Sequence, residues 1–446
     1  MEQHLKAVKA LLCVSRILGL VPYSLSEGVT PTLSVPALVY SILFVVVNVS
    51  FPWYHLVRVH RLGTSHAESV PELGVSILSV TAILTTMLST SISLFRCRHV
   101  LQILTDALYL CSFIGDKSST PQKSLTIIIK LLLLECIPFF LLYLVFCASL
   151  DDITMGLFSM PFSFFILFGP FMVIVQFASF VLLCMHLLSC INTCLGEILT
   201  ELSFPDSDRI IKLSPLRSDF LSAKRHLRRP SFKIIPSKLT PRRNHVSGMS
   251  TSSPQIFSVR PKNLPGLISR GKFEIPSLID FHTDVCDIVR RINSAYSARI
   301  LVNVADAFVS ITVSLFCSYF VPMQHNRGKS TSLFIMLIYW NFMKLLVLLR
   351  VCTICAEEGS RTAFLVHKIL TKTRDPELRE ELQIFSLQLL HRKVQFTACG
   401  FFPLDFSLLY SIVGAVTTYL VILIQFQLAV PNTNRNETTS HGRGTA

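Results

Sequence analysis

Long runs of hydrophobic residues, separated by polar segments, dominate the chain. Seven of them are long enough, at about 20 residues, to cross the hydrocarbon core of a bilayer as a helix. These runs occupy residues 36–57, 73–95, 125–147, 157–189, 299–321, 333–354 and 404–429. The fourth is longer than a bilayer requires, so we expect its helix to continue beyond the membrane through 191–202. The pattern predicts an all-α, polytopic membrane protein with seven transmembrane helices.

Two further segments show helical periodicity with too few apolar residues to span a membrane. Residues 278–299 place apolar side chains on one helical face and lead directly into the fifth run. Residues 376–391 repeat this pattern before the last run. We expect these cytoplasmic helical extensions to pack together beneath the membrane as an anchor region.

The distribution of Lys and Arg predicts the orientation in the membrane. Basic residues are concentrated in the N-terminal segment and in the second, fourth and sixth loops, and they are sparse in the other loops and the tail. Loops rich in Lys and Arg stay in the cytoplasm. The N-terminus is therefore predicted to be cytoplasmic and the C-terminus extracellular. The sequon that begins at Asn436 falls in the predicted extracellular tail, where it can be glycosylated.

Composition and charge agree with a membrane protein. Only 15% of the residues are charged, whereas soluble domains carry about a quarter. The net charge of +14 would suit nucleic acid in a soluble protein, but here basic loops beside anionic lipid account for it. We therefore expect membrane lipids and no nucleic acid as partners. No nucleotide-binding, zinc-protease or hydrolase motif is found, so the sequence predicts no enzyme, cofactor or metal site.

The segment 203–276 is rich in Ser, Pro and Arg and lacks a sustained hydrophobic period. It cannot bury enough apolar surface to fold alone, so we predict a disordered, basic part of the long cytoplasmic loop. Ser231 follows Arg228-Arg229-Pro230. Its phosphorylation would add negative charge among the arginines and weaken their attraction to anionic lipid, although a simply solvated loop explains the same composition.

The last hydrophobic run carries a stripe of small and polar residues on one helical face. The stripe includes Ser411, Thr418, Ile422 and Gln425. Small and hydroxyl residues allow helices to pack closely, but a stripe of this kind can equally line a pore. Asp405 precedes the helix, where it would either cap the helix N-terminus or place carboxylates at the inner mouth of a pore.

Three ionisable residues fall within predicted membrane spans, where an unpaired charge is costly. They are Glu135, Asp306 and Lys344. The fifth and sixth runs form a hairpin that brings Asp306 and Lys344 to within about one helical turn of the same depth. We predict that Lys344 pairs with Asp306 or, failing that, with Glu135. Such a pair would orient the helices or take part in ligand sensing.

Three stretches of the C-terminal part resemble the signatures of the insect gustatory receptors. Thr418-Tyr419, followed by five aliphatic residues and Gln425-Phe426, is similar to the motif that closes members of that family. The segment from Phe396 to Asp405 resembles the family's approach to the same helix. The third match comprises His282, Cys286 and Asp287 followed by Ile292-Asn293 and Tyr296-Ser297.

This resemblance implies a tastant-gated, non-selective cation channel of the plasma membrane. Family members assemble as homotetramers or heterotetramers around one pore, which Gln425 and Phe426 would close near its outer end. Physically, rings of Ile422 and Phe426 could gate by dewetting, with Thr418 and Ser411 further along the pore. The leading alternative is a metabotropic seven-helix receptor that signals through G proteins, which requires the opposite orientation.

Aromatic residues in the outer halves of the spans are the candidates for binding the tastant. They are Trp340, Tyr339, Tyr143, Phe162, Phe165 and Tyr319. Few hydroxyl side chains accompany them, so composition slightly favours an apolar ligand over a sugar.

The complete prediction divides the chain into seven parts. They are a cytoplasmic N-terminus (1–35), transmembrane helices 1–4 (36–189), a cytoplasmic loop (190–298), transmembrane helices 5 and 6 (299–354), a cytoplasmic anchor helix (355–403), a pore-lining helix (404–429) and an extracellular tail (430–446).

Overall fold

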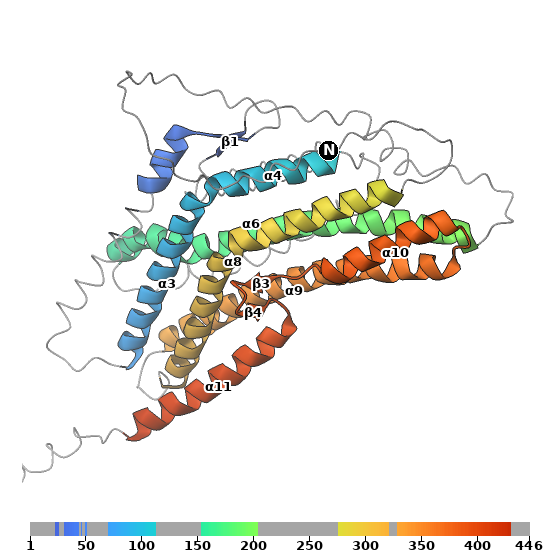
Figure 1. The fold of residues 1–446 in the computed structure, drawn as a ribbon. Coiled ribbons are helices and arrows are strands. Elements are labelled where there is room, and N and C mark those ends of the chain that lie inside the picture. The colour runs from blue at the N-terminus through green and yellow to red at the C-terminus, as the bar shows by residue number, and fades with distance from the viewer. Residues whose placement is uncertain are drawn as a thin grey trace, which may run out of the picture.

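The computed structural model describes residues 23–25, 31–43, 46, 50, 70–112, 153–203, 275–320 and 328–429. Helices make up most of this part of the chain (Figure 1). The labelled elements are β1 (Tyr23–Leu25), β2 (Pro31–Leu33), α3 (Val70–Phe95), α4 (Cys97–Ser112), α6 (Ile153–Ser203), α8 (Ile275–Phe320), α9 (Gly328–Lys372), α10 (Pro376–His391), β3 (Thr397–Ala398), β4 (Phe402–Pro403) and α11 (Phe406–Ala429).

Five helices of the described residues are long and apolar enough to cross a membrane, namely α3, α6, α8, α9 and α11. They contain the second, fourth, fifth, sixth and seventh predicted spans. The third predicted span, 125–147, lies outside the described residues, and the first, 36–57, is described only in part. The expectation of several long apolar helices is therefore confirmed by these five, and the number of seven stays a prediction.

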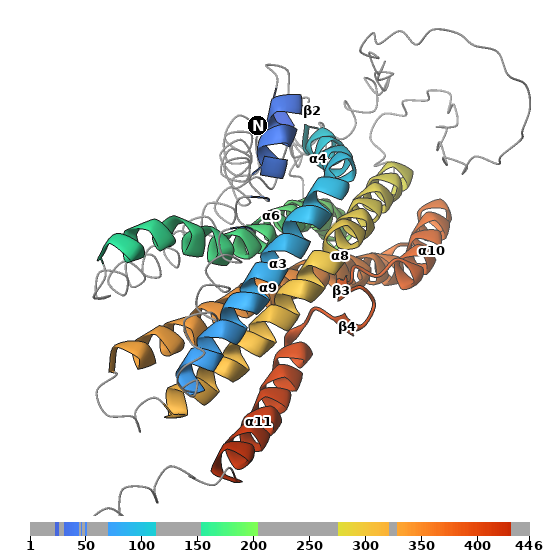
Figure 2. The ribbon, with the colours of Figure 1, turned by 90° about the vertical axis from the view of Figure 1, so that its left-hand side faces the viewer.

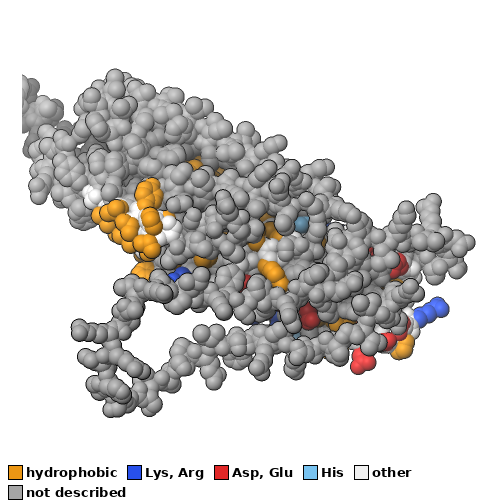
Figure 3. All heavy atoms as spheres, turned by 90° about the horizontal axis from the view of Figure 1, so that it is seen from above, with side chains coloured by type: hydrophobic (Ala, Val, Ile, Leu, Met, Phe, Trp, Pro, Cys, Tyr) orange, Lys and Arg blue, Asp and Glu red, His pale blue; other side chains and the backbone are white. Residues whose placement is uncertain are grey.

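Three of the helices are much longer than a bilayer is thick. α6, α8 and α9 contain 51, 46 and 45 residues, whereas about 20 residues cross the hydrocarbon core. The excess length of all three gathers with α10 at one end of the molecule (Figures 1 and 2). Exposed charged residues of α9 and α10 lie at this end, which is seen from above in Figure 3.

A polar clamp joins α6 to α9 in this end region. The amide Nδ2 of Asn192 donates to the backbone oxygen and to Oε1 of Glu358, each at 2.9 Å, while the hydroxyl of Thr362 donates to Asn192 Oδ1 at 2.7 Å. Asn192 and Thr362 are buried. Because a buried polar group is costly unless it is paired, these bonds fix the register of the two helices.

The region 355–403 contains the end of α9, α10 and a small β-hairpin. Helix α9 ends at Lys372, and a new helix, α10, begins because Asp375 and Pro376 favour a helix start. The Asp375 carboxylate accepts a hydrogen bond from the backbone N–H of Glu377 at 3.1 Å, and proline occupies the first turn.

The described residues are helical as expected, apart from two pairs of very short strands. β1 pairs with β2, and β3 with β4, both antiparallel. Three residues, 399–401, join β3 to β4, and Cys399 and Gly400, the central residues of the turn, have φ values of 51° and 78°. The N–H of Phe401 donates to Ala398 O at 3.0 Å. Positive φ at both central residues is typical of the tight turns that close β-hairpins.

Helix α4 occupies a segment that the sequence analysis treated as a loop. Its apolar residues recur at helical spacing and are buried against α6 and α8. They include Val100, Ile103, Leu104, Ala107 and Leu110. A search for long hydrophobic runs misses such a helix because only one of its faces is apolar.

We predict that Gly359→Ala destabilises the protein by about 1–3 kcal/mol, as overpacking does. A Cβ at this position of α9 would lie 2.8 Å and 2.9 Å from two atoms of Val394. Thermal unfolding in detergent measures the effect, and Val394→Ala in the same chain should restore only part of the loss, because it removes Cγ2 but keeps the Cβ at 2.9 Å. Gly196→Ala in α6 is the matched control, because its Cβ would meet nothing within 4 Å. Equal melting temperatures for Gly359→Ala and wild type would contradict the contact.

Candidate functional site

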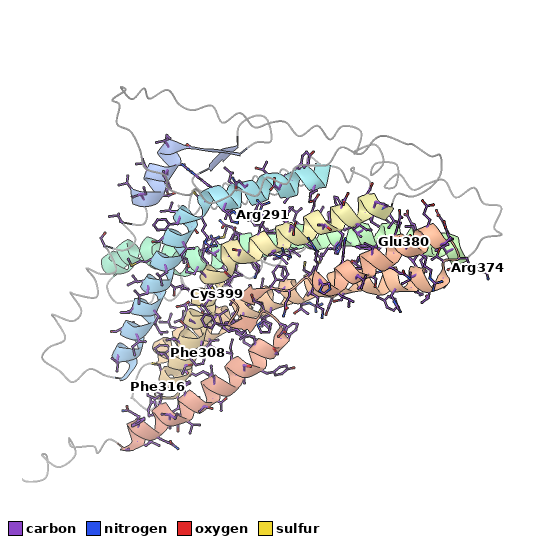
Figure 4. All side chains as sticks on the ribbon, in the orientation of Figure 1. Arg291, Phe308, Phe316, Arg374, Glu380 and Cys399 are labelled. Carbon is purple, nitrogen blue, oxygen red and sulfur yellow. The ribbon has the colours of Figure 1, made fainter. Side chains whose placement is uncertain are left out.

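Helix α11 makes only limited contact with the other described helices. Of its 24 residues, only Leu408, Ile412 and Val416 are buried. These three recur every four residues and so form a narrow strip on one face. Beyond this strip, the ring of Tyr419 meets that of Phe308 on α8, with 5.8 Å between centroids. Figure 4 labels Phe308 on α8 near α11.

The polar stripe predicted from the sequence lies outside this strip. Ser411, Thr418, Ile422 and Gln425 are all exposed in the single chain. The hydroxyls of Ser411 and Thr418 donate to backbone oxygens one turn earlier, at 3.1 Å and 3.0 Å. Phe426 is 71% exposed. A second protein surface or water can therefore reach the whole stripe.

Asp405 caps α11. Its Oδ1 accepts a hydrogen bond from the Ser407 N–H at 2.9 Å and another from the Ser407 hydroxyl. This is the capping contact that the sequence allowed, and it places the negative charge at the positive end of the helix dipole.

The structure brings Lys344 and Asp306 together. Lys344 Nζ on α9 lies 3.6 Å from Asp306 Oδ2 on α8. The two side chains are only 5% and 7% exposed. Glu135, the alternative partner, lies outside the described residues. Each charge neutralises the other, because either charge alone would be buried among apolar helices.

Further polar groups lie within one helical turn of this pair. Asn303 precedes Asp306 by three residues, and Asn341 precedes Lys344 by three. Both asparagines are buried, and each donates through Nδ2 to its own helix at 2.8 Å. Within the described part of the chain, Asn303 Oδ1, Asp306 Oδ1 and Asn341 Oδ1 have no hydrogen-bond partner. All three are oxygen acceptors, so they would satisfy a donor placed among them.

The aromatic candidates do not form one cluster in the described residues. Trp340 is buried, and its ring packs against that of Phe171 on α6 with 4.7 Å between centroids. Tyr339 and Tyr319 are 47% and 48% exposed. Tyr339 and Trp340 differ because successive residues of a helix point about 100° apart. Of these candidates, only Trp340 joins the interior near Asn341.

Several predicted site residues cannot be placed. Phe162 and Phe165 belong to α6, but their side chains lie outside the described residues. Tyr143, Ser231 and Asn436 lie outside them altogether, as does the basic segment 203–276 apart from residues 203, 275 and 276.

The sequence analysis missed the role of Arg299. This guanidinium is 1% exposed and lies 3.9 Å from the centre of the Tyr296 ring. It also donates to the Ser93 hydroxyl at 2.8 Å, which ties α8 to α3. The spacing of Tyr296 and Arg299 could have predicted their contact from the sequence, because residues three apart share a helix face.

The residues between α10 and α11, 392–405, form a connector that contacts α6, α8 and α9. Figure 4 labels Cys399 in this segment. Asn293 on α8 exchanges hydrogen bonds with Thr397. The Phe396 ring meets that of Phe177 on α6, and Val394 approaches Gly359 on α9. The stretches 282–297 and 396–405, which both resemble family signatures and are far apart along the chain, are therefore in contact.

We predict that Lys344→Met and Asp306→Leu each destabilise the protein by about 3–5 kcal/mol, because each leaves one buried charge without a partner. The double variant should recover most of the loss, since it removes both charges. Thermal unfolding in detergent gives the comparison. Arg290→Ala is the control, because Arg290 and Asp287 form a pair whose side chains are 68% and 47% exposed. A double variant as unstable as the worse single variant would contradict the pairing.

Comparison with known proteins relates the chain to chemoreceptors of insects. The matched segments of curated relatives cover about a third of the chain. Gustatory receptor 28a of Drosophila melanogaster is 34% identical over 177 residues, which are 38% of this chain and 39% of that protein. The same species' gustatory receptor for bitter taste 66a is 31% identical over 35% of this chain and 31% of its own length. The gustatory receptor for sugar taste 43a of the same species is 27% identical over 34% of this chain and 36% of its own length.

The fold resembles that of a solved insect receptor over nearly the whole chain. The olfactory receptor OR5 of Machilis hrabei, in complex with eugenol, superposes with a TM-score of 0.62, covering 94% of this chain and 98% of that one at 12% identity. The sequence description of the 7tm chemosensory receptor family matches residues 8–430. The chain therefore belongs to the 7tm chemosensory receptor family and is an all-helical, multi-pass membrane receptor apart from its short strands.

Proposed function

We propose that this protein is a gustatory receptor of the plasma membrane that acts as a tastant-gated, non-selective cation channel. The observation that carries the proposal is the exposure of the uncharged stripe on α11. A membrane-spanning helix that buries only Leu408, Ile412 and Val416 in its own chain has most of its surface available for other subunits, lipid or a pore. Four copies of α11, in a homotetramer or a heterotetramer with related receptors, would enclose the pore.

The proposed gate lies near the end of α11. Ile422 and Phe426 are 39% and 71% exposed, and Gln425 between them supplies a neutral polar group. Rings of apolar side chains close a pore by excluding water, and widening the rings lets water and ions return. No residue of α11 is charged. A permeating cation therefore meets no fixed positive charge along the helix.

The proposed ligand is a small tastant that contacts the interior near Trp340. Trp340 offers an aromatic surface, and the oxygens of Asn303, Asp306 and Asn341 can accept hydrogen bonds. This combination favours a molecule with both an apolar face and a hydrogen-bond donor, which extends the apolar preference suggested by composition alone. The ligand would open the channel only by binding the open state more tightly than the closed state.

The proposed topology follows the basic loops and the helix lengths. The N-terminus is cytoplasmic, and the end region formed by α6, α8, α9 and α10 projects into the cytoplasm as the anchor. The last helix then runs outward and leaves residues 430–446 outside the cell. The scarcity of Lys and Arg after α11 supports this orientation.

Current in excised membrane patches tests the channel. Cells expressing this chain are challenged with a panel of sugars and bitter compounds, without added nucleotide. We expect evoked cation current, and we expect Gln425→Ala to change the leak or the block of that current several-fold because it alters the constriction. Gln427→Ala is the matched control, since residue 427 lies about 200° around the helix from 425. Evoked current that requires a soluble second messenger would favour the metabotropic alternative.

The topology is tested by glycosylation and by epitope access. Asn436→Gln should remove a glycan and so increase the mobility of the full-length protein on a gel, because only an extracellular tail meets the glycosylation machinery. An epitope added before residue 1 should be labelled only after the cells are permeabilised. Labelling of that epitope on intact cells would overturn the proposed orientation and support the metabotropic alternative.

A further inference from the structure

We propose that Asn293 is a positioning residue, which holds the connector (392–405) so that a displacement of α8 is transmitted to α11. This inference rests on the proposed channel function, because it assigns a route between the bundle and the gate. Its basis is the contact between α8 and the connector, which can be tested apart from channel activity.

Asn293 uses both ends of its side-chain amide on one residue of the connector. Its Nδ2 donates to the Thr397 hydroxyl at 3.3 Å, and its Oδ1 accepts a hydrogen bond from the Thr397 backbone N–H at 3.1 Å. The second bond matters more for position, because it fixes the main chain at the start of β3. A pair of bonds from one planar amide also restricts rotation of the connector about α8.

Neighbouring contacts limit the connector on either side of Thr397. Arg392 Nη1 meets Asp287 Oδ1 on α8 at 3.1 Å, although both side chains are partly exposed, so this pair contributes little energy. Phe396 is 3% exposed and lies edge-on to Phe177 of α6. The Leu404 N–H donates to Phe396 O at 2.9 Å and closes the hairpin. A shift at Asn293 therefore moves the hairpin as one unit.

The hairpin leads directly into α11. Pro403 ends β4, Asp405 caps the helix, and α11 begins at Phe406. No flexible linker separates the capped helix from the strand pair. In both views the chain passes through β3 and β4 into α11, which packs along α8 (Figures 1 and 2). The connector therefore attaches α11 to α8 in addition to the three buried side chains of α11 itself.

Helix α8 links this contact to the bundle interior. Asn293 and Asp306 belong to the same uninterrupted helix, 13 residues apart, or about 20 Å at 1.5 Å per residue. A helix transmits a shift or rotation over this distance with little internal distortion, because its backbone hydrogen bonds are continuous. Movement near the Lys344–Asp306 pair would therefore displace Asn293, and with it Thr397 and the start of α11.

Hydrogen exchange tests the contact without a ligand. In the purified, detergent-solubilised chain, Asn293→Ala should speed amide exchange in the peptide covering 396–405 by roughly tenfold, because it removes the bond to the Thr397 N–H and loosens the hairpin. Ser294→Ala, an exposed neighbour on α8, is the matched control and should leave exchange unchanged. Asn293→Asp keeps an acceptor for both Thr397 groups and should stay near wild type. Unchanged exchange in Asn293→Ala would overturn the proposal, whatever the channel does.

Patch current then separates positioning from ligand binding. Using the panel compound that evokes current in wild type, we expect Asn293→Ala to lower the maximal current per surface receptor by roughly tenfold, with the half-saturating concentration shifted less than twofold. Asn293→Asp should restore the maximum, and Thr397→Val should be intermediate because it loses only the hydroxyl bond. Faster exchange with an unchanged maximum would refute transmission. If wild type at the surface passes no current for any compound, either alone or with a co-expressed related receptor, the channel proposal fails, while the exchange result still decides whether Asn293 holds the connector.

Discussion

The requirement to satisfy every backbone hydrogen bond in hydrocarbon shapes this molecule. Lipid offers no donors or acceptors, so the chain crosses it as continuous helices. Three of these helices extend well past the length needed for crossing, and their excess segments pack into one end region. Between α9 and α11 the backbone is irregular at the start of α10 and in the β3–β4 hairpin. Rigid helices therefore connect the apolar bundle to the segment that precedes α11.

The bundle and α11 depend on different kinds of packing. Within the bundle, burial is extensive, and even the ionisable groups Lys344, Asp306 and Arg299 have specific partners on other helices or aromatic rings. Helix α11 has a narrow buried strip and an otherwise exposed surface. The contrast is the expected result when one helix of a subunit completes its packing against other molecules.

Sequence reasoning located the long helices because a run of about 20 apolar residues has few alternatives to forming a membrane-spanning helix. It also found the Lys344–Asp306 pair, because the connection between the fifth and sixth spans fixes how deep each residue lies in the membrane. This depth does not depend on how either helix is rotated about its axis. The rotation of each helix about its own axis, which decides which side chains are buried, was harder to predict. Tyr339 and Tyr319 are exposed, whereas Trp340 is buried. The β3–β4 hairpin was missed because each of its strands has only two residues. Likewise, no apolar period reveals the bonds between Asn293 and Thr397, which depend on the tertiary approach of two segments.

The short strip that attaches α11 to its own subunit has an evolutionary consequence. Leu408, Ile412 and Val416 are aliphatic and meet the neighbouring helices through shape rather than through specific polar bonds. Side chains deep in the bundle can therefore change with few compensating changes in α11. Under the proposed function, a lineage could diversify the chemistry that its members detect while keeping one common output element, and sequence divergence should accumulate faster in the first half of the chain than in the last helix.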